Sequence, residues 1–578
     1  MAVFRSDQAQ LTFAVEAAIG GDPEMIEGTA GTGSTTSSAA FEAGSRAITV
    51  ASASNFTVGD QIRIGTVAGT PANTVEEHEV RRIEFIDGTT FVLDRPTGFY
   101  HASGQEVKEI TAVGGAADRN DDNKYLTWIP GVYETVDTPD PEMTIEPRRF
   151  LGTQSKRNFA IAYKGQQTFS GGVSGIVLLN GWPLRFPIGK VVTTPSSVSG
   201  TIAINKAAGV KKGDIFVPLD GGDVGTIAVG DYINIDDGST LVSEVRRVIS
   251  IPVSGTYKLN APLQFDHDDN ASVAECASAA TYTHVISESV GLDTVSWHVH
   301  MRDSGETAAN DFDRRYVGGM IGSAVIAAEE GGLVTMSWDS VNFLDMVHNQ
   351  NNQTSSQLYS GASVAASMPR YALMQAIDVD DVGQPGLNDA SGFPTTEPYY
   401  FSQGQIKFFG QEFARVRSFS LNISNGEEPR YYIGRKGMGR HRGPSEIFEG
   451  AREYSLSCSV TLPDSAAATS SDQTTAMELF KQLLLEGDFG GTSAAQAMAG
   501  FTMMLRFDRG ANDSIIIDIP SSTTAGSPTA ASHALNSQGA FIRTAPHTIT
   551  TDNPFQVDLD ILFRALKITV NDSVPVYP

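Results

Sequence analysis

Residues 418–424 read Ser-Phe-Ser-Leu-Asn-Ile-Ser, and residues 454–462 read Tyr-Ser-Leu-Ser-Cys-Ser-Val-Thr-Leu. Apolar and polar side chains alternate along both stretches with a period of two. This period is typical of antiparallel strands that bury one face of a sheet and expose the other face to water. We therefore expect two amphipathic strands here, joined by the Gly- and Arg-rich loop at 424–450.

The polar face of these two strands is made of small, uncharged side chains that are rich in hydroxyl groups. Its residues are Ser418, Ser420, Asn422, Ser455, Ser457, Ser459 and Thr461. The plain interpretation of this surface is the solvated face of a β-sandwich, because sheets with one wet face are common.

The composition describes a large, acidic protein that is rich in β-structure. With 578 residues the chain is long enough for several domains, and its 57 glycines suit a fold with many turns. The formal net charge of -26 argues against a protein that grips nucleic acid, because neutralising phosphates requires an excess of Lys and Arg. An acidic surface can still act beside DNA by repelling it.

The two cysteines, Cys276 and Cys458, are too few for a disulfide framework or a four-ligand zinc site. Cys458 falls on the apolar side of its strand, where we expect a buried thiol. No stretch reaches the about 18 apolar residues of a membrane helix, and the N-terminus lacks the apolar core of a signal peptide. We expect a protein that is made in a cytoplasm and does not enter membranes.

Two segments of the chain, 41–112 and 197–280, repeat the same features in the same order. The first copy holds Val58-Gly59-Asp60, Glu79-Val80-Arg81-Arg82, Leu93-Asp94-Arg95-Pro96, His101 and Val107, and the second holds Val229-Gly230-Asp231, Glu244-Val245-Arg246-Arg247, Leu259-Asn260-Ala261-Pro262, His267 and Val273. Short alternating stretches with Gly, Asn and Asp turns predict a small β-barrel or sandwich for each copy. Because other sequence separates them, we expect two modules inserted into a host domain.

A second duplication concerns the host domain itself. An aromatic-x-Gly-x-x-x-aromatic-Ser pattern starts at Tyr163 and again at Phe448. Each copy is followed by an apolar segment that we interpret as helical, at 173–179 and at 475–485. Ser471 or Asp472 can cap the second helix and Gly487 can end it.

These patterns predict a mainly β protein with a duplicated β-sandwich or barrel domain, one flanking helix and two small inserted β modules. The stretch from Glu27 to Ser38 has the composition of an arm or linker. The predicted segments are the N-terminal arm at 1–40, the first module at 41–112, the first host half at 113–196, the second module at 197–280, and the second host half at 281–578 with a long arm at 345–400.

The residues of the chain assemble no recognisable active site, and we expect no enzyme and no cofactor. No nucleophile, base and orienting group occur together in a known pattern. His298 and His300 share one strand face, but zinc needs a third ligand, so we interpret them as surface or interface histidines. Asp378, Asp380 and Asp389 match calcium-loop positions, but Val382 stands where the loop needs an oxygen ligand. We therefore predict no metal site.

A basic cluster stands out in the acidic chain: Arg430, Arg435, Lys436, Arg440 and Arg442. A nucleic-acid site would need a wider basic face with stacking aromatics, although Tyr431 and Tyr432 lie next to the cluster. A contact with an acidic neighbouring subunit explains the cluster better, because opposite charges guide docking and fix register.

The chain resembles the phage tail tube, or major tail, protein family. The resemblance rests on the strand at 416–425, on the loop and strand that follow from Gly443 to Tyr454, on 316–338, and on 175–189. It covers roughly residues 113–196 and 281–578, whereas the two modules depart from the basic plan of the family.

The resemblance implies a β-sandwich that forms stacked rings around a channel through which DNA passes without specific binding. The seven polar-face residues would then line the lumen, and the basic cluster would contact the next ring. Because the host domain is duplicated, we favour a ring of three chains with pseudo-sixfold symmetry over a ring of six. The partners would be further copies of this chain and other tail proteins, in a virion tail assembled in the host cytoplasm.

Two alternative functions remain open at this point. The chain could be a distal tail or baseplate adaptor, which differs from a tube protein in its copy number per virion. It could also be a surface carbohydrate-binding protein that uses the modules as binding domains, with Phe99 and Tyr100 as the best candidate platform.

Overall fold

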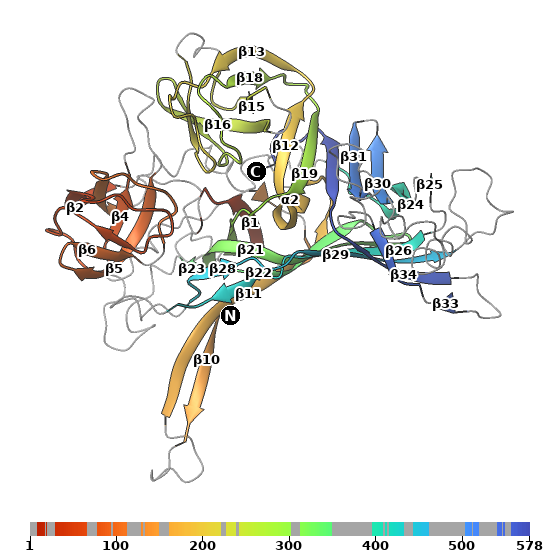
Figure 1. Cartoon of the computed structure of the whole chain (residues 1–578), viewed down its shortest axis with the longest axis horizontal. Helices are drawn as coiled ribbons and strands as arrows, with labels where there is room; N and C mark the ends of the chain where they lie inside the picture. Colours follow the sequence, from red (N-terminus) through yellow and green to blue (C-terminus); the bar gives the residue numbers. More distant parts are fainter. Residues whose placement is uncertain are drawn as a thin grey trace, which may run out of the picture.

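The computed structural model describes residues 9–348, 396–461 and 503–577, with gaps at 18, 20–28, 66–77, 94–95, 113–128, 131–132, 150–160, 221–226, 239–241, 302–311, 409–410, 413–415, 433–442, 511, 520–539, 546 and 549–555. Within these residues the molecule is built almost entirely from antiparallel strands, as the sequence predicts (Figure 1).

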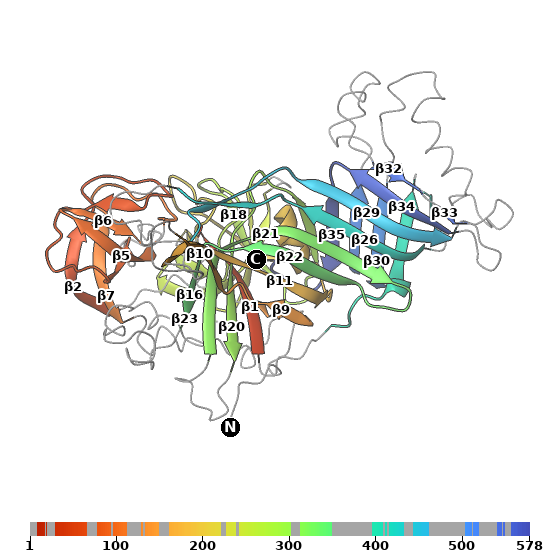
Figure 2. The ribbon, with the colours of Figure 1, turned by 90° about the horizontal axis from the view of Figure 1, so that it is seen from below.

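Fourteen strands of the described chain form one sheet, here called the large sheet (Figures 1 and 2). Its main path runs through β10 (Pro141–Arg148), β11 (Ile161–Val177), β22 (Thr335–Asn342), β21 (Phe312–Glu329), β26 (Val416–Ser424), β29 (Glu453–Thr461), β34 (Gln556–Phe563) and β32 (Ala540–Thr544). Six strands pair beside this path: β1 (Ala9–Val15), β8 (Ile129–Pro130), β9 (Thr135–Asp137), β20 (Val295–Met301), β23 (Asp345–His348) and β33 (His547–Thr548).

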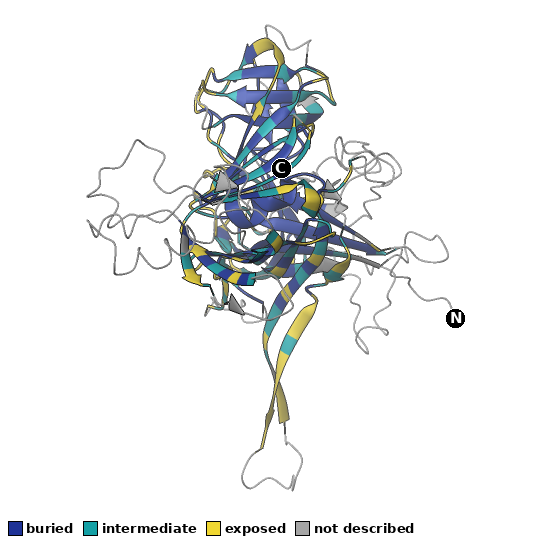
Figure 3. Cartoon of the chain, turned by 90° about the vertical axis from the view of Figure 1, so that its right-hand side faces the viewer, coloured by how far each residue is buried: buried dark blue, intermediate teal, exposed yellow. Residues whose placement is uncertain are grey.

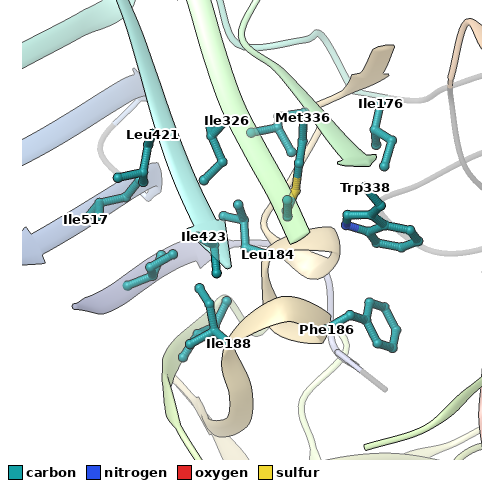
Figure 4. Close-up of a cluster of buried hydrophobic side chains, with 14 of the residues drawn as sticks. Ile176, Leu184, Phe186, Ile188, Ile326, Met336, Trp338, Leu421, Ile423 and Ile517 are labelled. Atoms are coloured by element: carbon teal, nitrogen blue, oxygen red, sulfur yellow. The ribbon is translucent and has the colours of Figure 1, made fainter. Parts of the chain in front are cut away.

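A second sheet packs on one face of the large sheet and completes a sandwich. Its strands, in order, are β12 (Gly189–Pro195), β19 (Tyr282–Glu288), β35 (Lys567–Asp572), β31 (Asp513–Ile519), β30 (Met503–Gly510), β24 (Gly404–Phe408) and β25 (Gln411–Glu412). One hydrophobic core joins both sheets and the helix α2 (Trp182–Ile188). Figure 4 shows Leu184 and Ile188 of this helix close to Ile423 of the large sheet.

Two short elements complete the host part of the described chain. The strands β27 (Glu428–Arg430) and β28 (Glu446–Phe448) pair as a separate hairpin between β26 and β29. A 3-10 turn, η7 (Phe401–Gln403), precedes β24.

The alternation that we read in the two quoted stretches is confirmed. Phe419, Leu421 and Ile423 are buried, and so are Tyr454, Leu456, Cys458 and Val460, whereas the residues between them are partly or fully exposed. The expected strands at 282–302 and 320–338 are also present, as β19 to β22. The thiol of Cys458 is buried, and burial raises its pKa to about 12, so it stays protonated and unreactive.

The interpretation of 173–179 as a helical segment is wrong, because β11 continues through Val177. Val173 and Ile176 are both buried although they are three residues apart. The register of β11 on β22 shifts between these two residues, and Gly175 adopts a left-handed φ of 67° there. A bulge of this kind breaks the period of two and imitates helical spacing. The α-helix of the described chain begins later, at Trp182.

Two of our predictions lie wholly or largely outside the described residues. The predicted helix at 475–485, with its caps at Ser471 or Asp472 and at Gly487, falls in 462–502. The predicted arm at 345–400 is described only at its two ends, where residues 345–348 form β23 and Tyr399 is buried in the core.

Two six-stranded sheets of the described chain correspond to the predicted modules. The first contains β2 (Thr29–Thr36), β7 (Glu106–Ala112), β4 (Gln61–Ile64), β5 (Glu79–Asp87), β6 (Thr90–Leu93) and β3 (Ala47–Thr49). The second contains β13 (Val198–Ala203), β18 (Ser272–Cys276), β15 (Tyr232–Asp236), β16 (Glu244–Val253), β17 (Thr256–Leu259) and β14 (Phe216–Pro218). The order of equivalent strands is identical, while the exact domain boundaries stay predictions.

The stretch for which composition predicts an arm or linker is partly a strand, since β2 pairs with β7. Its glycines make room for the side chain of Glu109, whose Oε2 accepts hydrogen bonds from Gly33 N at 2.8 Å and Thr32 Oγ1 at 3.2 Å. A Cβ at Gly31 would lie 2.5 Å from the carboxyl carbon of Glu109. The small residues allow close packing at this strand. Because a linker has the same composition, composition alone could not distinguish the two.

The repeated residues of the modules form the same buried network twice. In the first module, Glu79 binds Arg81 at 2.5 Å and His101 at 2.9 Å, and Arg81 Nε donates to the carbonyl of Pro96. In the second module, Glu244 binds Arg246 at 2.6 Å and His267 at 2.8 Å, and Arg246 Nε donates to the carbonyl of Pro262. The shared sequence pattern therefore specifies the interior of each module.

Each module lies between two strands of the host that pair with each other. The second module occupies the turn of the β12–β19 hairpin, where Pro195 is directly opposite Tyr282. The first follows β1 and precedes β8, and these two strands also pair. The modules touch through Phe99, which packs against Ile215 and Phe216 of the second module.

The electrostatics of the second module give a test of its network. Burial alone would raise the pKa of Glu244, but the charge of Arg246 and the hydrogen bond from His267 hold it below its usual range. Burial alone would lower the pKa of His267, but its hydrogen bond and ion pair with Glu244 raise it above the ordinary value. Protonated His267 is therefore the form that stabilises the fold.

We expect His267→Gln to destabilise the second module more at about pH 6 than at about pH 9. A histidine whose pKa is raised by folding contributes fully below its ordinary pKa of about 6.5, and this contribution disappears as the pH rises through the raised value. Hydrogen exchange of β16 and β18 in the full chain should show a roughly tenfold greater loss of protection at the lower pH. Equal losses at both pH values would contradict this assignment, and Val229→Ala in the same module is the control.

Candidate functional site

The polar face of the large sheet is continuous across β26 and β29. Directly opposed residues of antiparallel strands share one face of the sheet. Ser418 pairs with Ser459, Ser420 with Ser457, and Asn422 with Ser455. Six of the seven predicted polar-face residues therefore form three rows on one face, and Thr461 lies on the same face at the end of β29, opposite Gln556.

These rows extend onto the neighbouring strands β21 and β34. The register gives the rows Glu329–Ser418–Ser459–Asp558 and Ala327–Ser420–Ser457–Asp560. On the opposite face, the row Ile326–Leu421–Leu456–Ile561 is completely buried. One face of the same strands thus supplies the core, and the other presents small polar and acidic side chains.

The polar face is concave. A trough of about 880 Å³ runs along it and is lined by residues from Glu134 and Ser174 at one side to Asp560 and Thr544 at the other. Four of the predicted residues line this trough: Ser418, Ser420, Ser457 and Ser459. Asn422, Ser455 and Thr461 belong to the same face but lie outside this trough lining.

Acidic groups dominate the charge of the trough. Glu134, Glu329, Asp558 and Asp560 all line it. Among the described residues, Arg543 reaches Asp560 at 2.7 Å, and Arg417 reaches Glu330 beside the trough at 3.6 Å. Both arginines are largely exposed, so water and salt weaken these pairs. A surface with this balance repels phosphate groups more than it attracts them.

The sequence matches a family model described as phage tail tube protein over residues 154–539. The match spans well over half of the chain. The chain belongs to the phage tail tube protein family. A comparison with curated proteins gives no match.

Membership makes this tail tube protein a structural component of the virion tail, which assembles with copies of itself into a tube and works with other tail proteins. The predicted fold class and family are therefore confirmed. The specific roles of the polar-face residues and of the basic cluster stay predictions.

The acidic members of the polar face were missed at the sequence level. Asp558 and Asp560 lie on β34, whose sequence Gln-Val-Asp-Leu-Asp-Ile-Leu-Phe alternates up to Ile561. The same period that identified β26 and β29 would have placed both aspartates on a polar face. Glu329 was not identified either, because only the pairing of β21 with β26 places it opposite Ser418.

Two hairpins of the tail tube protein leave the large sheet at the same end. The β10–β11 hairpin projects from the body and is largely exposed (Figures 1 and 3). The β27–β28 hairpin follows Ser424, which lies at the corresponding end of β26. The two hairpins touch, since Tyr431 Oη donates to the carbonyl of Gln167 at 3.2 Å.

The basic cluster is described only in part. Arg430 ends β27, where it is exposed, pairs with Glu428 at 2.8 Å and lies over the ring of Phe448. The other four residues, Arg435, Lys436, Arg440 and Arg442, lie outside the described residues.

We interpreted His298 and His300 as surface or interface histidines, and a position on the surface of the single chain is wrong. Both side chains are buried, because β20 lies between β1 and β21 and is covered on both faces. In the part of the chain that the structure describes, no group of three His, Cys, Asp or Glu side chains could hold a metal ion. The calcium-like stretch from Asp378 to Asp389 lies outside that part.

The described residues contain no helix that is long and apolar enough to span a membrane.

A buried carboxylate lies at the base of the β27–β28 hairpin. The carboxylate oxygens of Glu427 are inaccessible to water, and one would lie 3.5 Å from a Cβ at Gly322 of β21. Burial raises the pKa of Glu427 to about 8, and the nearby charge of Glu449 adds to this rise, against a hydrogen bond with Asn342 that lowers it. Glu449 itself accepts a hydrogen bond from Leu292 N at 2.8 Å.

We expect Glu427→Gln to stabilise the protein above about pH 8 and to have little effect near pH 5. The raised pKa means that the folded chain keeps a proton that the unfolded chain releases near pH 4.5. The free energy of unfolding therefore falls as the pH rises from about 4.5 to about 8. The variant removes the buried charge and should raise the melting temperature by roughly 1–3 °C at high pH. A thermal scan at several pH values measures this.

The exposed neighbour Glu428 supplies the control for that experiment. Glu428→Gln should not raise the melting temperature at high pH, because this side chain is exposed. A pH-independent effect of Glu427→Gln would contradict the burial of its charge.

Proposed function

We propose that three copies of this chain close into a ring, and that the polar face of the large sheet lines the channel of the resulting tube. DNA passes through this channel without specific binding. The observation that carries the proposal is the concave trough, to which strands from both halves of the chain contribute small polar and acidic side chains.

The chemistry of the trough suits the passage of DNA. Holding DNA requires Lys and Arg at the phosphates, since release of counterions supplies most of the sequence-independent affinity. The rows of the polar face instead offer serine hydroxyls between carboxylates. Such a lining stays hydrated and repels the DNA backbone, which keeps a moving duplex away from the wall.

The large sheet supports ring closure through its two edges. In the described chain, the path starts at β10, with β9 beside it, and ends at β32. An open sheet edge presents backbone donors and acceptors that pair readily with another strand. Pairing of one chain's β32 with the β9 side of the next would join the polar faces into one closed wall.

The width of the sheet favours three chains over six. The path has eight strands, so a trimer supplies three times eight, or about 24, strands to the wall. At a spacing of about 4.8 Å and a tilt of about 40°, the backbone diameter is about 48 Å. Six chains would double this diameter to about 96 Å, which is much wider than a DNA duplex needs.

The inserted modules fit the outside of such a tube. The second module extends from the β12–β19 hairpin of the second sheet, which covers the face of the large sheet that is opposite the trough. The carbohydrate-binding alternative is weakened, because Phe99, one of its two candidate binding residues, is partly buried against the second module. Tyr100 remains exposed.

The lining can be tested with the double variant Ser420→Arg and Ser457→Arg. Both residues are paired on the polar face, so we expect rings to form and to bind short duplex DNA, with an affinity that falls steeply with salt. Electron microscopy counts the rings, and fluorescence anisotropy measures the binding. The matched control is Val229→Arg, a new cation on the exposed surface of the second module.

Two outcomes would contradict the proposal. Wild-type protein that stays monomeric at high concentration and native salt would exclude the tube. Rings of the double variant that bind DNA no better than the Val229→Arg control would remove the polar face from the channel.

The basic cluster gives a separate prediction. Replacing Arg435, Lys436, Arg440 and Arg442 with Ser should lower the fraction of protein that sediments as long tubes, because a contact with an acidic neighbour would be lost. The melting temperature should stay unchanged, since the Gly- and Arg-rich sequence predicts a loop for these residues. Normal tube lengths would remove this loop from the contact between rings.

A further inference from the structure

The two projecting hairpins carry the same residues in the same arrangement. Their first strands contain Glu146-Pro147-Arg148 and Glu428-Pro429-Arg430. Their second strands carry an aromatic residue directly opposite the glutamate, because Tyr163 pairs with Glu146 and Phe448 pairs with Glu428. We call each of these units, a Glu-Pro-Arg strand opposite an aromatic residue, a hairpin stem.

The side chains within the stems also correspond. In each stem the arginine forms an ion pair with the glutamate two residues before it: Arg148 with Glu146, and Arg430 with Glu428. Alternate residues of a strand lie on one face, so each ion pair shares a face with the aromatic ring. Arg430 confirms this for the second stem, since its guanidinium carbon lies 5.7 Å from the centre of the Phe448 ring.

Both stems stand in the same relation to the large sheet. Six residues beyond each exposed aromatic, a second aromatic residue enters the core, Phe169 in β11 and Tyr454 in β29. The serine that follows is opposite an asparagine in both cases, with Ser170 paired to Asn342 and Ser455 paired to Asn422. The duplication seen in the sequence therefore places two equivalent stems at one end of one chain.

The aromatic residues of the stems are open to solvent. Tyr163 is 49% exposed and Phe448 is 54% exposed, although their counterparts Phe169 and Tyr454 are 5% and 1% exposed. Ile145, Ile161 and Tyr432 on the same hairpins are exposed as well. Single apolar residues on a surface are ordinary, but a group of them at one end of a molecule marks a contact site.

The prolines indicate how the contact is made. Pro147 and Pro429 remove a backbone donor from the outer strand of each hairpin, and proline in a sheet is confined to such edge positions. An edge of this kind is a poor template for adding another strand. Recognition at the stems therefore depends on side chains, an aromatic ring beside an arginine and a glutamate.

The opposite end of the large sheet offers complementary chemistry. The register places the β21–β22 turn at the end away from the stems, because Thr335 is opposite Val177 and Asn342 is opposite Ser170. Glu329 and Glu330 are exposed at this turn, and the exposed Tyr400 forms a bridge with Leu333 beside it. Carboxylates next to an exposed ring suit the arginine and the aromatic side chain of a stem.

We propose that both stems bind a second copy of this chain in the next ring, through two equivalent head-to-tail contacts. This proposal rests on the proposed tube function. A contact between one end of a molecule and the other end of its copy does not close on itself and builds an open filament. Since one chain supplies two stems, a ring of three chains presents six stems to the next ring.

The test compares Tyr163→Ser, Phe448→Ser and the double variant with wild-type protein. We expect each single variant to raise the concentration needed for tube growth by about tenfold, by similar amounts, and the double variant to stop at single rings. Sedimentation measures growth, and mass photometry measures the rings. Tyr100→Ser, which removes an equally exposed aromatic residue from the first module, should leave tube growth unchanged.

A second pair of variants guards against loss of folding. Arg148→Glu and Arg430→Glu change exposed side chains and should block growth while rings and melting temperature stay normal. Normal growth of the single and double aromatic variants would overturn the proposal, and a large effect of only one stem would refute their equivalence. Absence of rings in wild-type protein would instead contradict the proposed tube function, so the two failures are distinguishable.

Discussion

The register of β26 on β29 is the constraint on which the rest of the structure depends. Because side chains alternate between faces, a slip of one residue would move Leu421 and Leu456 into water and bring serines into the core. The correct register simultaneously completes the apolar core and aligns the polar rows. The core and the trough are therefore two consequences of one pairing, and neither can change without the other.

The sequence predicted those features that follow from local periodicity. Alternation identified β26 and β29, and the repeated Glu-x-Arg and His residues identified two related modules. It failed where packing alters the local period, as at the bulge near Gly175, or where long-range pairing determines burial, as for His298 on β20. The alternation of β34 could have placed Asp558 on a polar face, but only the pairing of the strands shows that Glu329 and Asp558 lie in one row with Ser418 and Ser459.

The duplication has different consequences in the two parts of the chain. In the modules, both copies keep the buried Glu–Arg–His network, so repetition preserves an interior. In the host, both copies keep a buried aromatic residue at the sheet and an exposed aromatic residue on a projecting hairpin. The residues that the two host copies share therefore include surface residues as well as core residues. In the proposed ring of three chains, a surface repeated on each polypeptide would supply near-sixfold contacts.

The attachment of the second module to the β12–β19 hairpin also has a consequence for how such chains gain and lose domains in evolution. The module enters and leaves where Pro195 and Tyr282 are already side by side. The wall of the sandwich is thus complete without the module. A domain whose own ends lie close together can be gained, lost or exchanged at this turn while the pairing of β12 with β19 is kept, which makes the turn a natural position for displaying foreign domains.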